Sequence, residues 1–213
     1  MPLSDARQYS PATLRNRSLI LTVLQQVLPA ERFKGKTVLE ISSGTGEHSV
    51  FFAPRLPYLR WLPSDPNPLA RDSIAAWQAA EPAPNLNPPI DLDTMASPWA
   101  VEQMAAYQGN IAAVVNINMI HISPWQACEG LMAGAARILP VDGILYLYGP
   151  FLQRGVATAP SNLAFDQSLK ARDQRWGIRQ LETVIELARS QALWHQQTIE
   201  MPANNLSVIF QRR

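Results

Sequence analysis

The sequence of 213 residues contains a single cysteine, Cys128. One cysteine excludes an intrachain disulfide and any metal cluster built from several thiolates. An excess of charge of one sign is also missing, because 18 Lys and Arg residues balance 17 Asp and Glu residues, leaving a net charge of +1. A balanced chain lacks the electrostatic footprint of proteins that bind nucleic acid nonspecifically, so we expect no nucleic-acid partner.

Long apolar runs are absent as well. The longest, such as NIAAVVNINMI at 110–120, are too short and too polar to span a bilayer, and the first ten residues lack the apolar core of a signal peptide. We therefore expect a cytoplasmic protein without a membrane partner. The hydrophobic fraction of 47% predicts a packed core, and the length suits one α/β domain over residues 1–213.

Apolar periodicity predicts strands and helices in alternation. Helices are expected at 12–28, 46–56, 69–80, 97–108 (with Ser97 as its cap), 124–139 and 178–192, and strands at 36–42, 58–65, 89–93, 110–119, 143–150, 194–202 and 205–213. Alternation indicates a parallel sheet covered by helices on both faces, whereas the tight MPANN turn makes the last two strands antiparallel. The polar stretch 151–176 is longer than an ordinary loop, which suggests a functional role.

The stretch TVLEISSGTGEHSVFFA (37–53) leads from a strand through a glycine turn into a helix. No lysine follows Gly46, so the turn is not a phosphate-binding P-loop. A dinucleotide motif would place its third glycine where Ser49 stands, and Glu40 before the turn would repel a pyrophosphate. A turn that holds no ligand is the remaining alternative.

Acidic residues at the next strand ends favour S-adenosylmethionine as the ligand. Asp65 ends the second strand, where its carboxylate could accept both hydroxyls of a ribose, and Asp93 follows the third. Ligands of open α/β sheets bind outside the carboxyl ends of the strands, where both residues fall. Glu40 suits a cationic sulfonium or ammonium group, and Gly44 and Gly46 allow close approach of the backbone.

The sequence resembles the class I methyltransferase-like proteins grouped with methyltransferase-like protein twenty-six. The likeness covers nearly the whole chain and is carried by LRNRSLIL (14–21), VLEISSGTGEHSVFFA (38–53), WLPSD (61–65), INMIHISP (117–124), LYGPF (147–151), SNLAFDQSLKARDQRWGIRQLE (161–182) and MPANNLSVIF (201–210). The resemblance implies a doubly wound, Rossmann-like sheet of seven strands, mostly parallel with the last strand antiparallel. It also implies that residues 1–30 cover the site and that 151–176 form the acceptor side.

The resemblance also implies a binding site for S-adenosylmethionine, with S-adenosylhomocysteine as the product. The residues expected to bind this cofactor are Glu40, Ser42, Gly44, Gly46, Asp65, Asp93, Asn118 and Met119. Ser42 departs from the general class I pattern, in which many members have a glycine. The expected activity is methyl transfer to a small-molecule or protein acceptor, and the alternative is a non-catalytic regulatory module that binds S-adenosylmethionine or S-adenosylhomocysteine.

Methyl transfer requires an aligned acceptor and, in some enzymes, a base. His121 could be a general base or orient the acceptor, because the ordinary pKa of histidine lies near neutrality; alternatively it caps the next helix or packs on Trp125. Asn118 is a second catalytic candidate, although with Met119 it more readily lines the cofactor. The tetrad NMIH (118–121) differs from the NPPY and DPPY signatures of nucleic-acid amino-methylating enzymes, which disfavours a DNA-base substrate.

Further side chains are expected around the acceptor, where we predict that one pocket unites Asn118 and His121 with residues of the acceptor side. The substrate candidates are Tyr148, Asp166, Arg172, Trp176 and Asn204, and the alternative for 166–176 is a solvated helix face anchored by Trp176. The segment Arg15–Arg17 could close over the carboxylate of the cofactor, and His48 could touch the cofactor or bond to the helix start. Histidines 48, 121 and 195 lack the i, i+4 spacing of a metal site, so no metal is expected.

Overall fold

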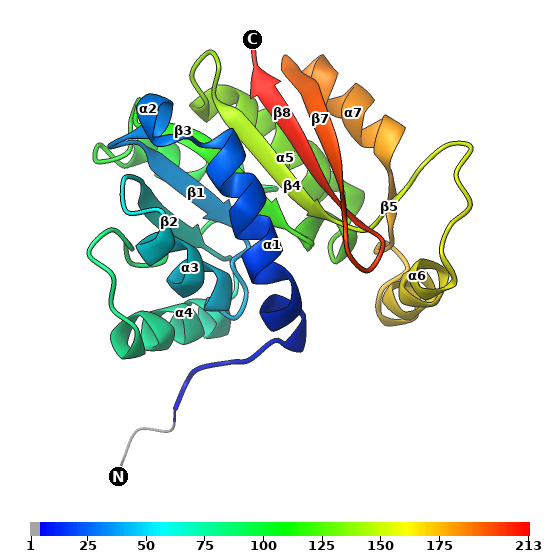
Figure 1. Ribbon diagram of the computed structural model, residues 1–213, viewed down its shortest axis with the longest axis horizontal. Helices are drawn as coiled ribbons and strands as arrows, with labels where there is room; N and C mark the ends of the chain where they lie inside the picture. The colour runs from blue at the N-terminus through cyan, green and yellow to red at the C-terminus, as the bar shows by residue number, and fades with distance from the viewer. Residues whose placement is uncertain (1–4) are drawn as a thin grey trace.

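The computed structural model describes residues 5–213. Its main sheet has six strands with helices on both faces (Figure 1). In the spatial order β2-β1-β3-β4-β8-β7 these are Arg60–Ser64, Thr37–Ile41, Ile111–Ile117, Ile144–Gly149, Asn205–Arg212 and Leu193–Met201. The first four are parallel, and β8 is antiparallel to both of its neighbours. The predicted doubly wound α/β class, with the last strand antiparallel, is confirmed.

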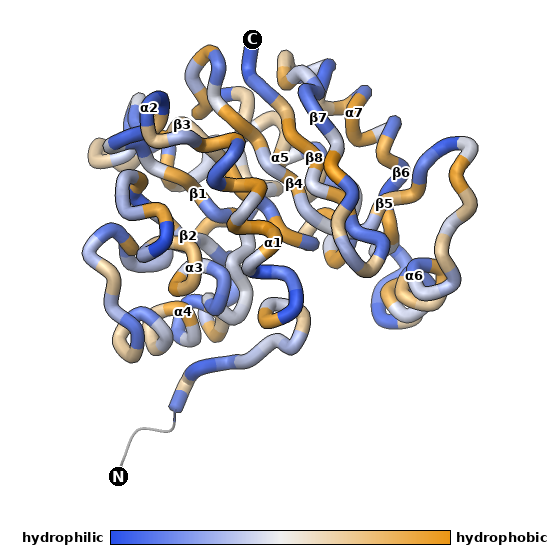
Figure 2. Tube along the Cα trace, viewed as in Figure 1, coloured by the Kyte–Doolittle hydropathy of each residue, from blue (hydrophilic) through white to orange (hydrophobic). Residues whose placement is uncertain are grey.

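The sheet is buried on both faces by two helical layers. One layer contains α1 (Pro11–Val27), α3 (Glu47–Phe52) and α4 (Pro68–Ala80), and the other contains α5 (Trp125–Ile138) and α7 (Leu181–Ser190). Successive residues of β1 divide between the layers: Val38 packs with Trp61 in the first, and Leu39 with Leu131 in the second. Apolar colour accordingly follows the central strands in Figure 2. The short elements are α2 (Ala30–Phe33), η1 (Ala53–Arg55), η2 (Ala100–Gln103), η3 (Met119–His121), β5 (Phe151–Leu152) and β6 (Arg179–Gln180), and the remaining helix is α6 (Pro160–Arg172).

The expected seventh strand at 89–93 does not form. Only an isolated parallel bridge joins Ile90 to Ser64, so the main sheet has six strands rather than seven. A second isolated bridge joins Leu86 to Trp61. Pro88 and Pro89 lie between the two bridges and lack backbone N–H groups, so they cannot donate to a ladder that would join the bridges into a strand.

The helix expected at 97–108 is reduced to the single turn η2, which begins after Trp99 rather than at Ser97. The Trp99 side chain is fully buried against Gly134 of α5, and its Nε1 donates to the Thr94 carbonyl (3.2 Å). Tertiary anchoring of this indole therefore overrides the local helical pattern.

The polar stretch 151–176 contains the helix α6, which a reading by apolar periodicity missed. Only Asn162 and Leu169 of this helix are buried, so α6 has no apolar stripe to mark it. The small parallel pair β5–β6 connects its two ends, and α6 lies outside the edge of the main sheet near β7 (Figure 1). Within residues 5–213, no helix has both the length and the apolarity to cross a membrane.

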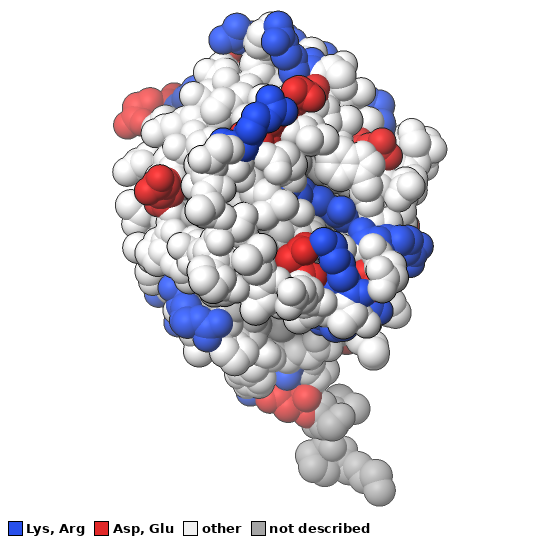
Figure 3. All heavy atoms as spheres, turned by 90° about the vertical axis from the view of Figure 1, so that its right-hand side faces the viewer, with Lys and Arg blue, Asp and Glu red and all other residues white. Residues whose placement is uncertain are grey.

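Figure 3 shows the face that carries α6 and α7. Basic and acidic side chains lie beside one another there instead of forming an area of one sign. Lys170–Asp166 (2.5 Å) and Arg175–Asp173 (2.7 Å) are ion pairs of this region.

Candidate functional site

The glycine turn after β1 contains one glycine that is closely packed and one that has open space around it. Gly46 has φ +89°, and a Cβ there would lie 2.8 Å from the Cα of Ile74 in α4. Gly44 has φ +57°, and a Cβ there would meet nothing within 4 Å. Ser42 also adopts a positive φ of 54°, a conformation that costs a residue with a Cβ about 1 kcal/mol. The turn is thus wedged against α4 on one side and presents bare backbone to open space on the other.

Asp65 stands beside this open space at the end of β2. Its Oδ2 accepts from the Gly44 N–H (3.0 Å) and its Oδ1 from the Asn67 N–H (2.9 Å), while the side chain is mostly buried. Burial raises the pKa of the Asp65 carboxyl, and the two backbone hydrogen bonds oppose that rise. A carboxylate offers about four lone-pair positions, so acceptor capacity remains for the hydroxyls of a ligand.

Glu40 turns away from the open space. Because it shares the strand face of Val38, its carboxyl lies beneath α3, where Oε2 accepts from Ser49 Oγ (2.6 Å) and Trp61 Nε1 (2.6 Å). The residue is 1% exposed, and burial raises its pKa to about 7. The structure therefore contradicts the expectation that Glu40 faces a cationic ligand; it supports the turn from below.

Glu47 occupies the first position of α3. Its Oε2 accepts from the Ser10 N–H (2.5 Å) and from Thr45 Oγ1 (3.0 Å), and the residue is 3% exposed. A helix N-terminus after a glycine turn is where dinucleotide-binding folds place a phosphate. In this chain the Glu47 carboxylate lies in the first turn of α3 and ties the segment before α1 to the glycine turn.

A cavity of about 680 Å³ lies at the carboxyl ends of β3 and β4 and is covered by α1, α6 and the β7–β8 turn. Its wall contains Ser10, Ala12, Arg15, Asn16, Leu19, Asn118, Ile122, Tyr148, Pro150, Ser161, Asn162, Phe165, Pro202, Ala203 and Asn205. Within residues 5–213, the wall includes no Asp, Glu, His or Lys. We call this space the acceptor cavity.

A hydrogen bond links α3, the helix after the glycine turn, to α1 at the acceptor cavity. His48 Nε2 donates to Asn16 Oδ1 (2.9 Å), since an amide oxygen can only accept, and Asn16 and Tyr148 both line the cavity. Burial lowers the pKa of His48 to about 3, so its ring is neutral near pH 7. Burial also raises the pKa of Tyr148, against the opposing effect of the Asn16 side chain, so its hydroxyl remains a donor.

The structure contradicts the expectation that His121 faces the acceptor. His121 is 0% exposed and packs edge-on against Phe151, and its Nδ1 accepts from the Arg179 N–H (3.3 Å). A Cβ at Gly149 would lie 2.6 Å from its Nε2, so the ring backs the strand end instead of lining the cavity. Burial lowers its pKa to about 3, which makes it a poor base in this position.

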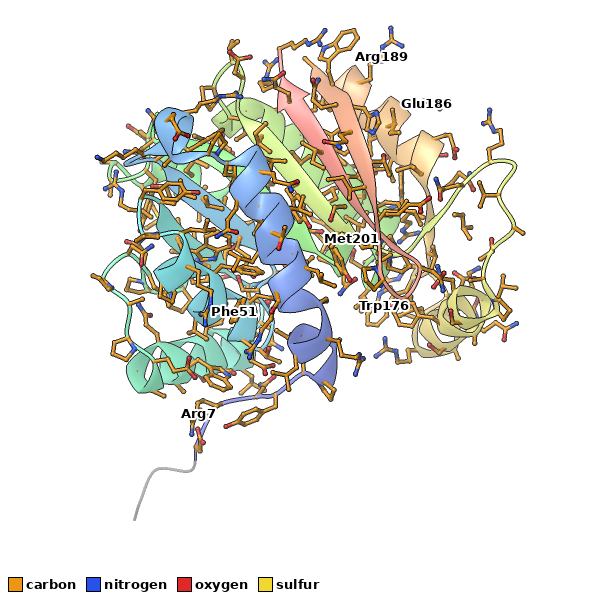
Figure 4. All side chains as sticks on the ribbon, viewed as in Figure 1. Arg7, Phe51, Trp176, Glu186, Arg189 and Met201 are labelled. Atoms are coloured by element: carbon orange, nitrogen blue, oxygen red, sulfur yellow. The ribbon has the colours of Figure 1, made fainter. Side chains whose placement is uncertain are left out.

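The predicted acceptor-side residues are only partly brought together. Asn118 and Tyr148 line the acceptor cavity, and the Asn118 N–H donates to the Tyr148 carbonyl (2.8 Å). Asp166 is instead bound to the Ile178 N–H (2.8 Å) and to Lys170, and Arg172 stacks over Trp176 near α6 (Figure 4). The side chains of Asp166, Arg172 and Trp176 therefore do not converge on the cavity.

Three other candidates lie outside the acceptor cavity. Asn204 lines a neighbouring cavity of about 220 Å³, and its side chain donates to Ser161 Oγ (3.2 Å). Asp93 is exposed, with Oδ1 accepting from the Met95 N–H (2.9 Å), and Met119 packs against the core beneath α5. A role for Asp93 at the cofactor stays a prediction.

Sequence reasoning missed Asn162 and Asn205, which line both cavities. Both lie within SNLAFD (161–166) and MPANN (201–205), stretches that had already been noted. The candidates predicted from these stretches are Asp166 and Asn204, whereas the fold turns the amides of Asn162 and Asn205 toward the cavities and pairs Asp166 with Lys170.

Stability is expected to fall as the pH drops below 6.5. His48 and His121 have folded-state pKa values of about 3 against 6.5 unfolded, so only the unfolded chain gains these protons, at about 1.4 kcal/mol per pH unit for each. Glu40, raised from 4.5 to about 7, has the opposite sign: its stabilising contribution is complete below pH 4.5 and is lost as the pH rises through 7. Between pH 6.5 and 4.5 it cancels one histidine, leaving a net loss of about 1.4 kcal/mol per unit.

Urea unfolding between pH 7.5 and 4.5, at about half-unit steps, measures this slope. Glu40→Gln removes the opposing titration, so its slope between pH 6.5 and 4.5 should be about twice that of the unaltered protein. A stability that does not change from pH 7 to pH 5 would contradict the buried neutral state of both histidines.

A family model with the description "Protein of unknown function (DUF938)" matches residues 7–212. The chain belongs to the DUF938 family. The glycine turn, the acceptor cavity and α6 all lie within the matched region of this DUF938 protein.

Solved structures place the DUF938 chain in the class I methyltransferase-like fold. An O-methyltransferase family protein from Burkholderia thailandensis has a TM-score of 0.75 at 15% identity, over 94% of this chain and 57% of that one. Human N-acetylserotonin methyltransferase in complex with SAM gives 0.72 at 13%, over 94% and 52%. The mitomycin 7-O-methyltransferase MmcR gives 0.70 at 17%, over 92% and 55%. The DUF938 chain thus spans little more than half the length of these proteins, and the likeness shows the fold alone.

Proposed function

We propose that this DUF938 protein is an S-adenosylmethionine-dependent methyltransferase that acts on a small-molecule or protein acceptor. The proposal includes a kinship with the group of methyltransferase-like protein twenty-six, which the sequence resembles. It also includes a cytoplasmic location without nucleic-acid or membrane partners, on the basis of the single cysteine and the balanced charge.

The observation that carries the proposal is the open space at Gly44 beside the Asp65 carboxylate. A ligand can approach the bare backbone of Gly44, and Asp65 has acceptor capacity for two ribose hydroxyls. The acceptor cavity lies at the same carboxyl edge of the sheet, which is where class I folds align acceptor and cofactor. S-adenosylmethionine, when bound, supplies an electrophilic methyl group, and Asn118 and Tyr148 would orient the acceptor.

The same turn disfavours NAD. The Glu47 carboxylate lies in the first turn of α3, where its negative charge would repel a pyrophosphate. Ser49 stands in place of the third glycine of a dinucleotide motif and donates to the carboxyl of Glu40. Both features are compatible with a nucleoside that carries no phosphate.

One observation favours the alternative of a non-catalytic module that binds S-adenosylmethionine or S-adenosylhomocysteine. Within residues 5–213 the wall of the acceptor cavity has no Asp, Glu, His or Lys that could take a proton. A module that only binds the nucleoside needs no such group.

The purified protein is expected to bind S-adenosylmethionine and S-adenosylhomocysteine but not NAD. Isothermal titration calorimetry with the three ligands measures this selectivity. Release of S-adenosylhomocysteine in the presence of a panel of acceptors then separates an enzyme from a binding module. Binding of NAD without binding of either sulfur nucleoside would overturn the proposal.

A further inference from the structure

The acceptor cavity offers hydrogen-bond donors but no proton acceptor of ordinary basicity. Its polar side chains are a tyrosine, four asparagines and two serines, and Arg15 is the one charged residue in the wall, as far as residues 5–213 are concerned. Two of the asparagine amides already donate to backbone carbonyls, Asn162 to Asn204 (3.0 Å) and Asn205 to Pro202 (3.1 Å) and Ala203 (3.3 Å). The Tyr148 hydroxyl, the Asn118 amide and the Arg15 guanidinium remain as donors for a ligand. Such a wall suits a negatively charged ligand better than a positive one.

Among residues 5–213, the carboxylates and histidines close to the cavity do not line it. Glu47 touches the wall through the Ser10 N–H, and its Oε2 also accepts from Thr45. His48 lies behind Asn16, to which it donates. His121 lies behind Gly149, where its Nδ1 accepts from the Arg179 N–H, so its buried Nε2 carries the proton and has no hydrogen-bond partner among the described residues. Glu200 lines the neighbouring cavity, not this one. An acceptor in the cavity therefore meets no free base that could remove its proton.

We propose that the acceptor is a small molecule that binds as an anion, through a carboxylate or thiolate formed in solution, and that Tyr148 donates a hydrogen bond to it. This inference rests on the proposed methyltransferase function. In the transfer, a lone pair of the anion forms a bond to the methyl carbon while the S–CH₃ bond breaks, and that electron pair passes to sulfur. The sulfonium and the anion both become neutral, as a thioether and a methyl ester or methyl thioether, and no proton is released.

The surroundings favour this loss of charge. Ala12, Leu19, Ile122 and Phe165 contribute apolar surface to the cavity, and opposite charges attract more strongly where the dielectric constant is low. The transition state carries less separated charge than the reactants, so an apolar wall does not penalise it. An alcohol, whose pKa lies far above neutrality, would have to lose its proton in the cavity, where the wall has no receiver. A neutral amine would become a cation on methylation, for which the described residues of the wall provide no counter-charge. The volume of about 680 Å³ lies within the usual range of small-molecule sites.

The decisive measurement is the pH dependence of methyl transfer to aryl thiols of graded acidity, with benzoates as the carboxylate arm. The midpoint of the kcat/KM profile is expected to follow the pKa of each thiol, and carboxylates, if accepted, should give flat profiles at neutral pH. A midpoint that stays constant across the thiols, or faster transfer to alcohols or amines, would overturn the inference but leave the enzyme a methyltransferase. Bound S-adenosylmethionine without transfer to any thiol or carboxylate also overturns it. A protein that fails to bind S-adenosylmethionine fails the proposed function itself.

Tyr148→Phe tests the proposed donor. The variant is expected to lower kcat/KM for the anionic acceptor about tenfold, mainly through KM, without moving the pH midpoint. Tyr146→Phe is the matched control, because Tyr146 lies on the same strand face but its hydroxyl is bonded to Ser207 Oγ (2.7 Å) outside the cavity. Equal KM values in Tyr148→Phe and the unaltered protein would remove Tyr148 from the site.

Discussion

Gly46→Ala is expected to destabilise the protein by about 2–5 kcal/mol. The substitution places a Cβ 2.8 Å from the Ile74 Cα, a backbone atom that cannot move without shifting α4. Overpacking typically costs about 1–3 kcal/mol, and the φ of +89° adds about 1–2 kcal/mol for a residue with a Cβ. Urea unfolding measures the sum.

Gly44→Ala is the matched partner of this change. The space around Gly44 is open, so stability should fall by only about 1 kcal/mol, from the positive φ alone. The new methyl group would project into the space proposed for S-adenosylmethionine and lower its affinity by at least about tenfold. A Gly44→Ala protein that binds S-adenosylmethionine as tightly as the unaltered chain would show that the ligand does not use this space.

Asp65→Ala is expected to weaken S-adenosylmethionine binding by at least about tenfold. Hydrogen bonds to a charged group contribute about 1.5–3 kcal/mol, of which water recovers a part, and about 1.4 kcal/mol corresponds to one decade of affinity. The substitution also frees the Gly44 N–H, so the turn loses one of its supports. Calorimetry measures the affinity, and urea unfolding shows whether the variant is folded.

Asp72→Ala controls for the loss of one negative charge near the site. Asp72 lies on α4, where it is exposed, and its removal should leave affinity within about twofold. Asp65→Asn keeps one acceptor oxygen, so its affinity for S-adenosylmethionine should lie between those of Asp65→Ala and Asp72→Ala. A folded Asp65→Ala protein with unchanged affinity would exclude Asp65 from the cofactor site.

Local patterns were sufficient to predict most of the elements. Buried strands such as Thr37–Ile41 and Ile111–Ile117 are short apolar runs bounded by turn residues, and their hydrophobicity is visible without any tertiary context. The tight turn before Asn205 fixed the antiparallel direction of β8 for the same local reason. Patterns failed where distant contacts decide: Trp99 shortened its helix by packing on α5, and α6 has too few buried residues to show a period.

The sequence by itself determined the fold class, the glycine turn and the order of the acidic strand ends, because each depends on residues that are close along the chain. Only the tertiary structure decided which side chains share a space. Glu40 and His121 have side chains that suit a functional site. However, Glu40 lies on the face of β1 that is covered by α3, and close packing at Gly149 keeps His121 behind the wall of the acceptor cavity. Asn16 reaches the acceptor cavity from α1, which precedes all strands, and Asn162 from α6, which lies between β4 and β7 in the chain. Their meeting depends on how these two helices pack against the sheet.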